Sequence, residues 1–146
     1  MARRPRVPCT WSNRCTRRPS AIVTETERYC TTHARKVADR LVGRFVKNRD
    51  GWKCQRCGER EGEQMQYAHV ISRGARFIQY EPDNAVCLCR DCHYYFTMKP
   101  GQWSVWLAAY RPGLHDRMAL LEAARERQGG GVDLAAIIET YRREYV

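Results

Sequence analysis

The sequence contains no apolar run long enough to cross a lipid bilayer, so it predicts no transmembrane helix. Residues Met1 to Pro8 are basic and lack the apolar stretch of a secretory signal. We therefore expect a cytoplasmic protein with no membrane partner. The length of 146 residues favours one domain with an accessory segment at each end.

Lysine is also scarce: the chain has 22 Arg but 4 Lys, and its formal net charge is +10. Acidic side chains are rare in the first third, where residues 1–50 hold 13 Lys and Arg against 4 Asp and Glu. Residues 51–146 are nearly balanced, with 13 basic and 12 acidic side chains. Arginine's planar guanidinium suits bidentate phosphate contacts, so this pattern favours a nucleic-acid partner. Charge that only keeps the protein soluble is the alternative.

Disulfides are disfavoured among the eight cysteines, because the cytosol is reducing. Cys54 and Cys57 form one C-x-x-C pair, and Cys89 and Cys92 form another. Each pair has the spacing of a tight turn that donates two thiolates to one tetrahedral ion. The two pairs therefore predict a structural zinc held by four cysteines. Dispersed core thiols would not explain why the pair recurs at this spacing.

A second and less regular set of ligand types lies upstream and consists of Cys9, Cys15, Cys30 and His33. Its C-x-x-H half has the same tight spacing, and the segment around it has few large apolar residues from which to build a core. This set predicts a second structural zinc. Cys87 is left over, and two roles stay open for it: a substitute ligand beside Cys89, or a small buried apolar residue.

Hydrophobic periodicity predicts an α+β fold, with short strands at residues 65–71 and 85–88 and a helix at 90–98. A preceding helix, capped by Thr31 or Thr32, is expected from about His33 to Asn48, where a turn signal follows. Tyr94 and Tyr95 are expected to pack the 90–98 helix against its surroundings.

The tail is expected to be helical, with an apolar stripe at 103–110, a helix at 114–128 and a last helix capped by Asp133. No internal repeat is present. We accordingly divide the chain into an N-terminal zinc-binding segment at 1–34, a connecting helix at 35–50, a core at 51–98 and a helical extension at 99–146.

Three polar residues, His69, Asn84 and His93, stand between and beside the cysteine pairs with the spacing H-x14-N-x8-H. Together with the segments RDGWKCQRCG (49–58), AHVISRG (68–74) and DNAVCLCRDCH (83–93), they resemble the HNH endonuclease family. The likeness is greatest to phage members and to NinG-like phage recombination proteins, and it covers residues 49–98. If the chain is encoded by a phage, its compartment is the host cytoplasm.

The resemblance implies a ββα-metal core, the HNH or His-Me finger, that hydrolyses DNA phosphodiester bonds and nicks duplex DNA with low sequence specificity. It assigns His69 as the general base that activates water and Asn84 as the residue that holds the loop of the base. His93 would hold one catalytic divalent metal, Mg, Mn, Ni or Zn. Neighbouring helix residues point about 100° apart, so Cys92 can face the zinc while His93 faces the active site.

Two positions depart from the family pattern. Ala68 stands where many members carry an acidic or histidine ligand before the base, and Thr97 stands where some carry a second histidine. The remaining ligands of the catalytic metal stay open among Asp83, Asp91, Asn84 and phosphate oxygens of the substrate.

Four arginines are candidates for DNA contacts. Arg73 and Arg76 lie in the loop after His69, and Arg40 and Arg44 lie on the connecting helix. For each of them, ordinary surface charge is the alternative.

Rival functions remain. A non-catalytic, zinc-dependent DNA-binding or packaging accessory protein would explain the charge and the cysteines, and Ala68 favours it. A nuclease for branched recombination DNA would use the same residues, with the tail forming a homodimer or meeting phage packaging or recombination proteins. A purely structural zinc scaffold would not bind DNA.

Overall fold

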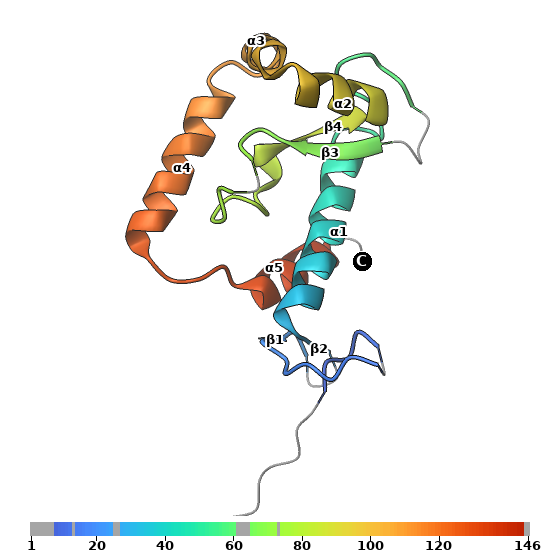
Figure 1. Cartoon of the computed structure of the whole chain (residues 1–146), viewed down its shortest axis with the longest axis vertical. Helices are drawn as coiled ribbons and strands as arrows, with labels where there is room; N and C mark the ends of the chain where they lie inside the picture. Colours follow the sequence, from blue (N-terminus) through green and yellow to red (C-terminus); the bar gives the residue numbers. More distant parts are fainter. Residues whose placement is uncertain (1–7, 13, 25–26, 61–64, 73, 145–146) are drawn as a thin grey trace, which may run out of the picture. The chain divides into compact units, whose positions relative to one another are not determined.

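The computed structural model describes residues 8–12, 14–24, 27–60, 65–72 and 74–144. Arg73 and the basic residues before Pro8 lie outside these ranges. The chain divides into two compact units, one formed by residues 1–41 with 133–146 and the other by residues 42–132. Figure 1 gives the order of the elements along the chain. No helix in the described part of the chain is both long and apolar enough to span a membrane.

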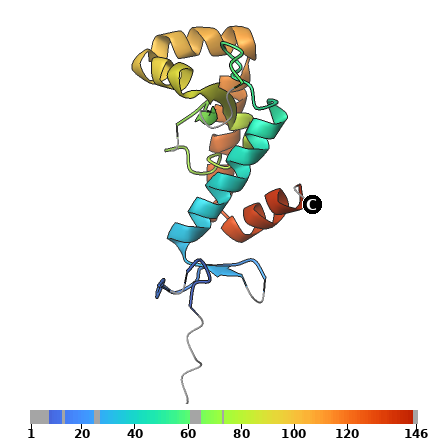
Figure 2. The same ribbon diagram turned by 90° about the vertical axis from the view of Figure 1, so that its right-hand side faces the viewer.

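The first unit is built on a small hairpin. Strand β1 (Ala21–Ile22) pairs antiparallel with β2 (Arg28–Tyr29), and helix α1 (Thr31–Arg49) begins directly afterwards (Figure 2). Helix α5 (Leu134–Arg143) belongs to the same unit and contacts β1. The expected cap of this last helix is confirmed, because Asp133 Oδ1 accepts a hydrogen bond of 3.0 Å from the Ala136 N–H.

An ion pair joins the hairpin to α5 within this unit. Arg142 on α5 donates to the carboxylate of Glu27, which also accepts a 3.0 Å hydrogen bond from the Tyr29 hydroxyl. Burial alone would raise the pKa of Glu27, but the hydrogen bonds from Arg142 and Tyr29 outweigh it and lower this pKa. Ile138, on the same helix, is fully buried.

Helix α1 begins two residues before the expected position. The Cys30 carbonyl already accepts a 2.9 Å hydrogen bond from the Ala34 N–H, so the first turn includes both threonines expected as caps.

In the second unit, a Cβ on Gly43 would lie 2.6 Å from Cε1 of Tyr67. Glycine is required there because the helix backbone approaches a strand side chain too closely for any larger residue.

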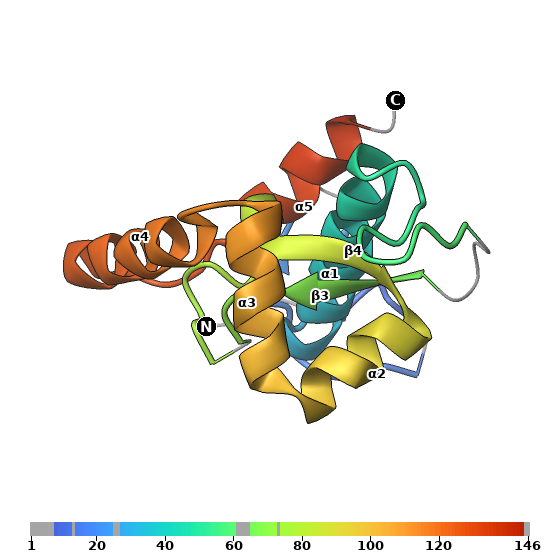
Figure 3. The ribbon, with the colours of Figure 1, turned by 90° about the horizontal axis from the view of Figure 1, so that it is seen from above.

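The second unit contains the core hairpin. Strand β3 (Met65–His69) pairs antiparallel with β4 (Ala85–Cys89), and His69 lies opposite Ala85. Between them a 3₁₀ turn, η2 (Pro82–Asn84), leads into β4, and helix α2 (Arg90–Met98) follows (Figure 3). The predicted order of strand, loop, strand and helix is confirmed. Every residue of β4 is buried, so this strand forms the centre of the core.

Strand β3 ends at His69, two residues earlier than predicted, because the backbone turns toward Asn84. The Val70 N–H donates to the Asn84 carbonyl at 2.8 Å, and the Ile71 N–H donates to Asn84 Oδ1 at 2.8 Å. The Asn84 side chain thus accepts the hydrogen bond that a backbone carbonyl would accept if the strand pairing continued. The start of the following loop is fixed by the same residue.

Helices α3 (Pro100–Tyr110) and α4 (Leu114–Gln128) complete this unit. Phe96 packs against the rings of Trp103 and Trp106, with centroids 5.1 and 5.2 Å away, so the aromatic stripe joins the core as expected. Tyr94 was expected to pack against its surroundings, but its side chain is exposed because it lies on the outer face of α2.

Helix α4 also holds the loop that follows β3. Arg125 donates to the Phe77 carbonyl at 2.9 Å and to the Glu81 carboxylate at 2.8 Å. Glu122 accepts a 3.0 Å hydrogen bond from the Phe77 N–H. The helical extension therefore braces the loop of the candidate base.

Candidate active site and metal clusters

The four cysteines of the two C-x-x-C pairs come together in one group. The sulfur atoms of Cys54, Cys57, Cys89 and Cys92 all lie within 4.8 Å of one another. Zinc–sulfur bonds of about 2.3 Å in a tetrahedron place the sulfurs about 3.8 Å apart. The Cys57 and Cys89 sulfurs are 3.8 Å apart, so the donor set fits a tetrahedral zinc ion.

Local backbone geometry creates this arrangement. The Gly58 N–H donates to the Cys54 carbonyl at 2.9 Å, and Gly58 has a φ of +82°, which glycine adopts without strain. At the other pair, the Cys92 N–H donates to the Cys89 sulfur at 3.4 Å at the start of α2. Burial raises the pKa of Cys54, but backbone N–H groups of Cys57 and Cys89 outweigh it and lower this pKa to about 7. The thiolate form of Cys54 is thereby favoured, whereas burial raises the pKa of Cys89 and Cys92.

Cys87 does not belong to this group. It is fully buried in β4, opposite Tyr67, and lies outside the four-cysteine set. Burial raises the pKa of its thiol to about 11, so it stays uncharged. Of the two roles left open by the sequence, the structure supports the small buried apolar residue.

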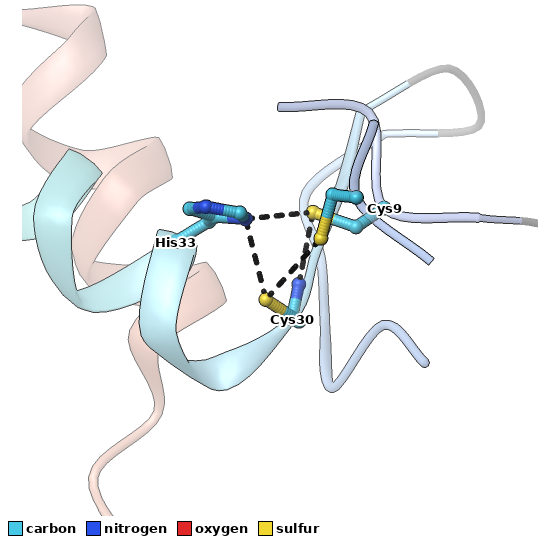
Figure 4. A group of neighbouring side chains, drawn as sticks. Cys9, Cys30 and His33 are labelled. Atoms are coloured by element: carbon cyan, nitrogen blue, oxygen red, sulfur yellow. Dashed lines mark hydrogen bonds between the residues drawn. The ribbon is translucent and has the colours of Figure 1, made fainter. Parts of the chain in front are cut away.

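The upstream set also converges. The Cys15 and Cys30 sulfurs are 4.0 Å apart, and His33 Nδ1 lies 3.4 Å from the Cys9 sulfur and 3.3 Å from the Cys30 sulfur. Figure 4 shows Cys9, Cys30 and His33 turned toward one another, with His33 on the first turn of α1. Zinc bonds of about 2.3 Å to sulfur and about 2.0 Å to nitrogen require similar separations. This cluster is also compatible with zinc.

His69, the candidate general base, ends β3. Its Nε2 lies 3.0 Å from the Gln79 carbonyl oxygen, which can only accept a hydrogen bond. Nε2 therefore carries the proton, and Nδ1 is the nitrogen with the lone pair in the neutral ring.

Asn84 is completely buried and bonds the loop on both sides. Its Oδ1 accepts from the Ile71 N–H at 2.8 Å, and its Nδ2 donates to the Ile71 and Ile78 carbonyls at 3.1 and 3.2 Å. Both N–H groups and one lone pair of the amide are thus used by the backbone. Asn84 is not among the residues that line the cavity shared by His69 and His93.

His93 stands on α2 and meets a strand residue that the sequence analysis did not single out. Its Nδ1 lies 2.7 Å from Oε1 of Gln66, so Nδ1 donates and Nε2 carries the lone pair of the neutral ring. Gln66 precedes Ala68 by two residues on β3, and this alternation was the signal in the sequence that could have revealed it.

A cavity of about 150 Å³ brings the two histidines together. Its lining consists of Ala68, His69, Leu88, His93, Phe96, Thr97 and Trp103. Both positions that depart from the family pattern, Ala68 and Thr97, therefore face the same space as His69 and His93. The four positions that the HNH pattern marks, Ala68, His69, His93 and Thr97, thus all line one cavity.

The acidic candidates for further ligands do not line this cavity. Asp83 lies 3.7 Å from Arg49, and Asp91 is 84% exposed beside Arg90. Neither carboxylate is thus placed beside His93 as a lining group.

Arg49 and Asp50 form a structural network that the sequence analysis missed. The guanidinium of Arg49 binds the Asp50 carboxylate at 2.8 and 3.0 Å and donates to the Pro82 and Ala85 carbonyls, both at 2.8 Å. Asp50 in turn accepts from the Cys87 N–H at 2.8 Å. Burial would lower the pKa of Arg49, but Asp50 outweighs it and raises this pKa. The pair fixes the entry to β4 next to Asn84.

The candidate DNA-contacting arginines occupy different settings. The Arg76 guanidinium lies 4.6 Å from the ring centre of Phe77, and that of Arg40 lies 5.2 Å from the ring centre of Trp11. Arg44 is exposed on α1, and Arg73 lies outside the described residues.

An antiparallel hairpin and a following helix form a ββα core, which contains two histidines in one cavity and a four-cysteine group compatible with zinc. Residues 54–94 match the family described as HNH endonuclease. This segment of the chain is therefore similar to the HNH endonuclease family, as its sequence predicted, and the predicted α+β fold class is confirmed. In general terms, this match supports endonuclease activity with DNA as the substrate. No curated protein and no solved structure matches the chain.

Proposed function

We propose that the chain is a metal-dependent HNH endonuclease that hydrolyses phosphodiester bonds and nicks duplex DNA with low sequence specificity. The observation that carries this proposal is the cavity lined by both His69 and His93. Two histidines at family spacing on different elements need not meet, and a shared cavity is what a base and a metal ligand acting on one phosphate require.

In this reaction His69 accepts a proton at Nδ1 from the attacking water, because the Gln79 carbonyl engages the Nε2 proton. The water oxygen bonds to phosphorus while the bond to the 3′ oxygen breaks, and that oxygen takes a proton from solvent. The products carry 5′-phosphate and 3′-hydroxyl ends. Asn84 keeps the base in place through its three hydrogen bonds to the loop.

His93 is the residue that would hold the divalent cation, which stabilises the negative charge of the reacting phosphate when bound. Magnesium commonly keeps several waters and takes only one or two protein ligands with substrate phosphates. Those protein ligands are usually carboxylates, whereas the imidazole of His93 beside Ala68 suits nickel or zinc better. Manganese, nickel and zinc are the other candidates.

Gln66 would act as a positioning residue for His93. By accepting from Nδ1 it orients the ring and presents the Nε2 lone pair for the cation. Gln66→Ala should weaken Mn²⁺ binding about 10–100-fold, as measured by calorimetric titration of the zinc-loaded protein. Gln66→Glu retains an acceptor oxygen and should restore binding, and Gln102→Ala on α3 is the matched control. Equal affinity in all four proteins would remove Gln66 from this role.

Two structural zinc ions complete the proposal, one held by the four-cysteine group and the other by Cys9, Cys15, Cys30 and His33. They contribute folding free energy and take no part in the reaction. None of the eight cysteines, all of them in the described ranges, forms a disulfide, which suits a reducing compartment such as the cytoplasm of a host cell.

The test is plasmid nicking with added magnesium, manganese, nickel or zinc. His69→Ala should reduce metal-dependent nicking by about 10²–10⁴-fold, the usual contribution of a general base. His115→Ala, which changes an exposed histidine on α4, should nick at the wild-type rate. A His69→Ala protein as active as wild type would overturn the assignment of the base.

A non-catalytic, DNA-binding accessory protein is the second candidate, and Ala68 favours it. This side chain is buried, lines the cavity and offers no ligand atom. Wild-type protein that binds plasmid but cuts it in none of the four metals would select this function.

The remaining expectations concern the biological setting. A phage-type protein resembling NinG-like recombination proteins would prefer branched DNA, and its helical extension would form a homodimer or meet phage packaging or recombination proteins. Comparing cleavage of branched and linear duplexes tests the first expectation, and sedimentation equilibrium tests the second. We propose Arg40, Arg44, Arg73 and Arg76 as DNA contacts.

A further inference from the structure

The N-terminal unit contains an open cleft of about 350 Å³ beside its metal cluster. Cys15 and His33 of that cluster line the cleft together with three cationic and three hydroxyl side chains: Arg14, Arg17, Lys36, Ser12, Thr16 and Thr32. No carboxylate belongs to this lining among the described residues. Each of the six cationic and hydroxyl side chains can donate a hydrogen bond, so the cleft is suited to an anion.

A side-chain hydrogen bond orders one wall of the cleft. Arg17 Nη1 donates to the Thr32 hydroxyl at 2.8 Å, which holds this arginine at the start of α1. Thr32 and Lys36 are four residues apart on the helix and so share one face. The first turn of α1 contains no acidic residue, so no side chain there offsets the positive end of the helix dipole.

The metal cluster would tie the two walls together. Cys15 comes from the loop that supplies Ser12, Arg14 and Arg17, whereas His33 comes from the helix that supplies Lys36. A metal ion shared by Cys15 and His33 would fix the separation of the loop and the helix. The positions of the cations would then follow from the folding of the cluster.

We propose that this cleft binds phosphate groups of a duplex DNA backbone, as an anchoring site in a different unit from the histidine cavity. The inference rests on the proposed function only in taking DNA as the ligand. Arg14 and Lys36 are exposed, and exposed cations hold a single small anion weakly. A polyanion differs because each neutralised phosphate releases counterions and the contributions add. The chemistry therefore fits a nucleic-acid backbone better than free phosphate.

The experiment measures duplex binding by fluorescence anisotropy over a range of salt concentrations, with full-length zinc-loaded protein and no added catalytic metal. The double variant Arg14→Ala/Lys36→Ala should raise Kd roughly 10–100-fold near 0.1 M salt and reduce the slope of log K against log salt by about 1.8, because about 0.9 is lost per phosphate contact. The matched control is Arg18→Ala/Arg35→Ala, which removes the same charge from exposed positions of the same unit outside the cleft lining.

The outcomes separate the two proposals. If only Arg14→Ala/Lys36→Ala loses duplex affinity, with zinc content and circular dichroism unchanged, the result supports the cleft as a DNA-binding site. This holds whether or not the protein cuts DNA. Equal loss in both double variants would mean diffuse attraction by net charge and would overturn the proposal. Full displacement of the duplex by equimolar inorganic phosphate would also overturn it, since the cleft would then be a site for a small anion. Failure of plasmid nicking in every metal concerns the endonuclease proposal alone.

Discussion

Replacing Asn84 by alanine tests the structural basis of the site most directly. The side chain is 0% exposed and makes three hydrogen bonds, one from the Ile71 N–H and two to the Ile71 and Ile78 carbonyls. Alanine would leave all three backbone groups without this partner in a buried setting. At about 1 kcal/mol for each bond, the variant should lose roughly 3 kcal/mol of unfolding free energy.

The assay for Asn84→Ala is urea unfolding followed by circular dichroism, together with plasmid nicking. With an m-value of about 1–3 kcal/mol/M, a loss of roughly 3 kcal/mol lowers the urea midpoint by about 1–3 M. Nicking should fall even where the protein is folded, because the same loop carries Gln79, the hydrogen-bond partner of His69.

Asp83→Ala, at the preceding residue, is the control variant for this test. Its carboxylate is 66% exposed and lies 3.7 Å from Arg49, so its loss should change stability by less than about 0.5 kcal/mol. If Asn84→Ala unfolds at the same urea concentration as Asp83→Ala, the claim that the buried amide holds the loop is refuted.

Two further variants probe the scaffold. Cys92→Ser should reduce the zinc content, counted by elemental analysis, by one ion per chain and unfold the core. Cys87→Ser should retain both ions. Loss of zinc in Cys87→Ser would make Cys87 a ligand. Gly43→Ala should destabilise the protein by about 1–3 kcal/mol because its Cβ would lie 2.6 Å from the Tyr67 ring. Gly101→Ala is its control, since a Cβ there meets nothing within 4 Å, and equal melting temperatures of the two variants would contradict the proposed close approach.

The extents of several elements follow from local sequence. The predicted limits of the helices at 90–98 and 114–128 agree with α2 (Arg90–Met98) and α4 (Leu114–Gln128). Turn and proline signals flank these helices, and such signals act over a few residues. The C-x-x-C pairs are similarly local, because a tight turn brings two sulfurs together wherever the chain carries it. Their convergence into one group agrees with the zinc site predicted from the sequence.

Contacts between segments far apart in the chain were harder to predict from the sequence. The end of β3 was misplaced because a buried side chain from η2, and not a backbone ladder, receives the Ile71 N–H. For Gln66, strand alternation indicates the face that it shares with Ala68, but not which residue of α2 lies over that side chain. Its distance of 2.7 Å to His93 depends on how α2 packs on the β3–β4 hairpin.

The sequence by itself therefore determined the ligand types, the order of the core elements and the three polar residues of the candidate site, because spacing and periodicity record local geometry. Only the tertiary structure decided which of these groups share a space. It placed His69 and His93 in one cavity, left Asp91 out of the lining of that cavity and excluded Cys87 from the cysteine group. It also gathered Arg14 and Lys36 into a cleft. Those outcomes depend on packing between segments far apart in the chain, and no local pattern encodes such distances.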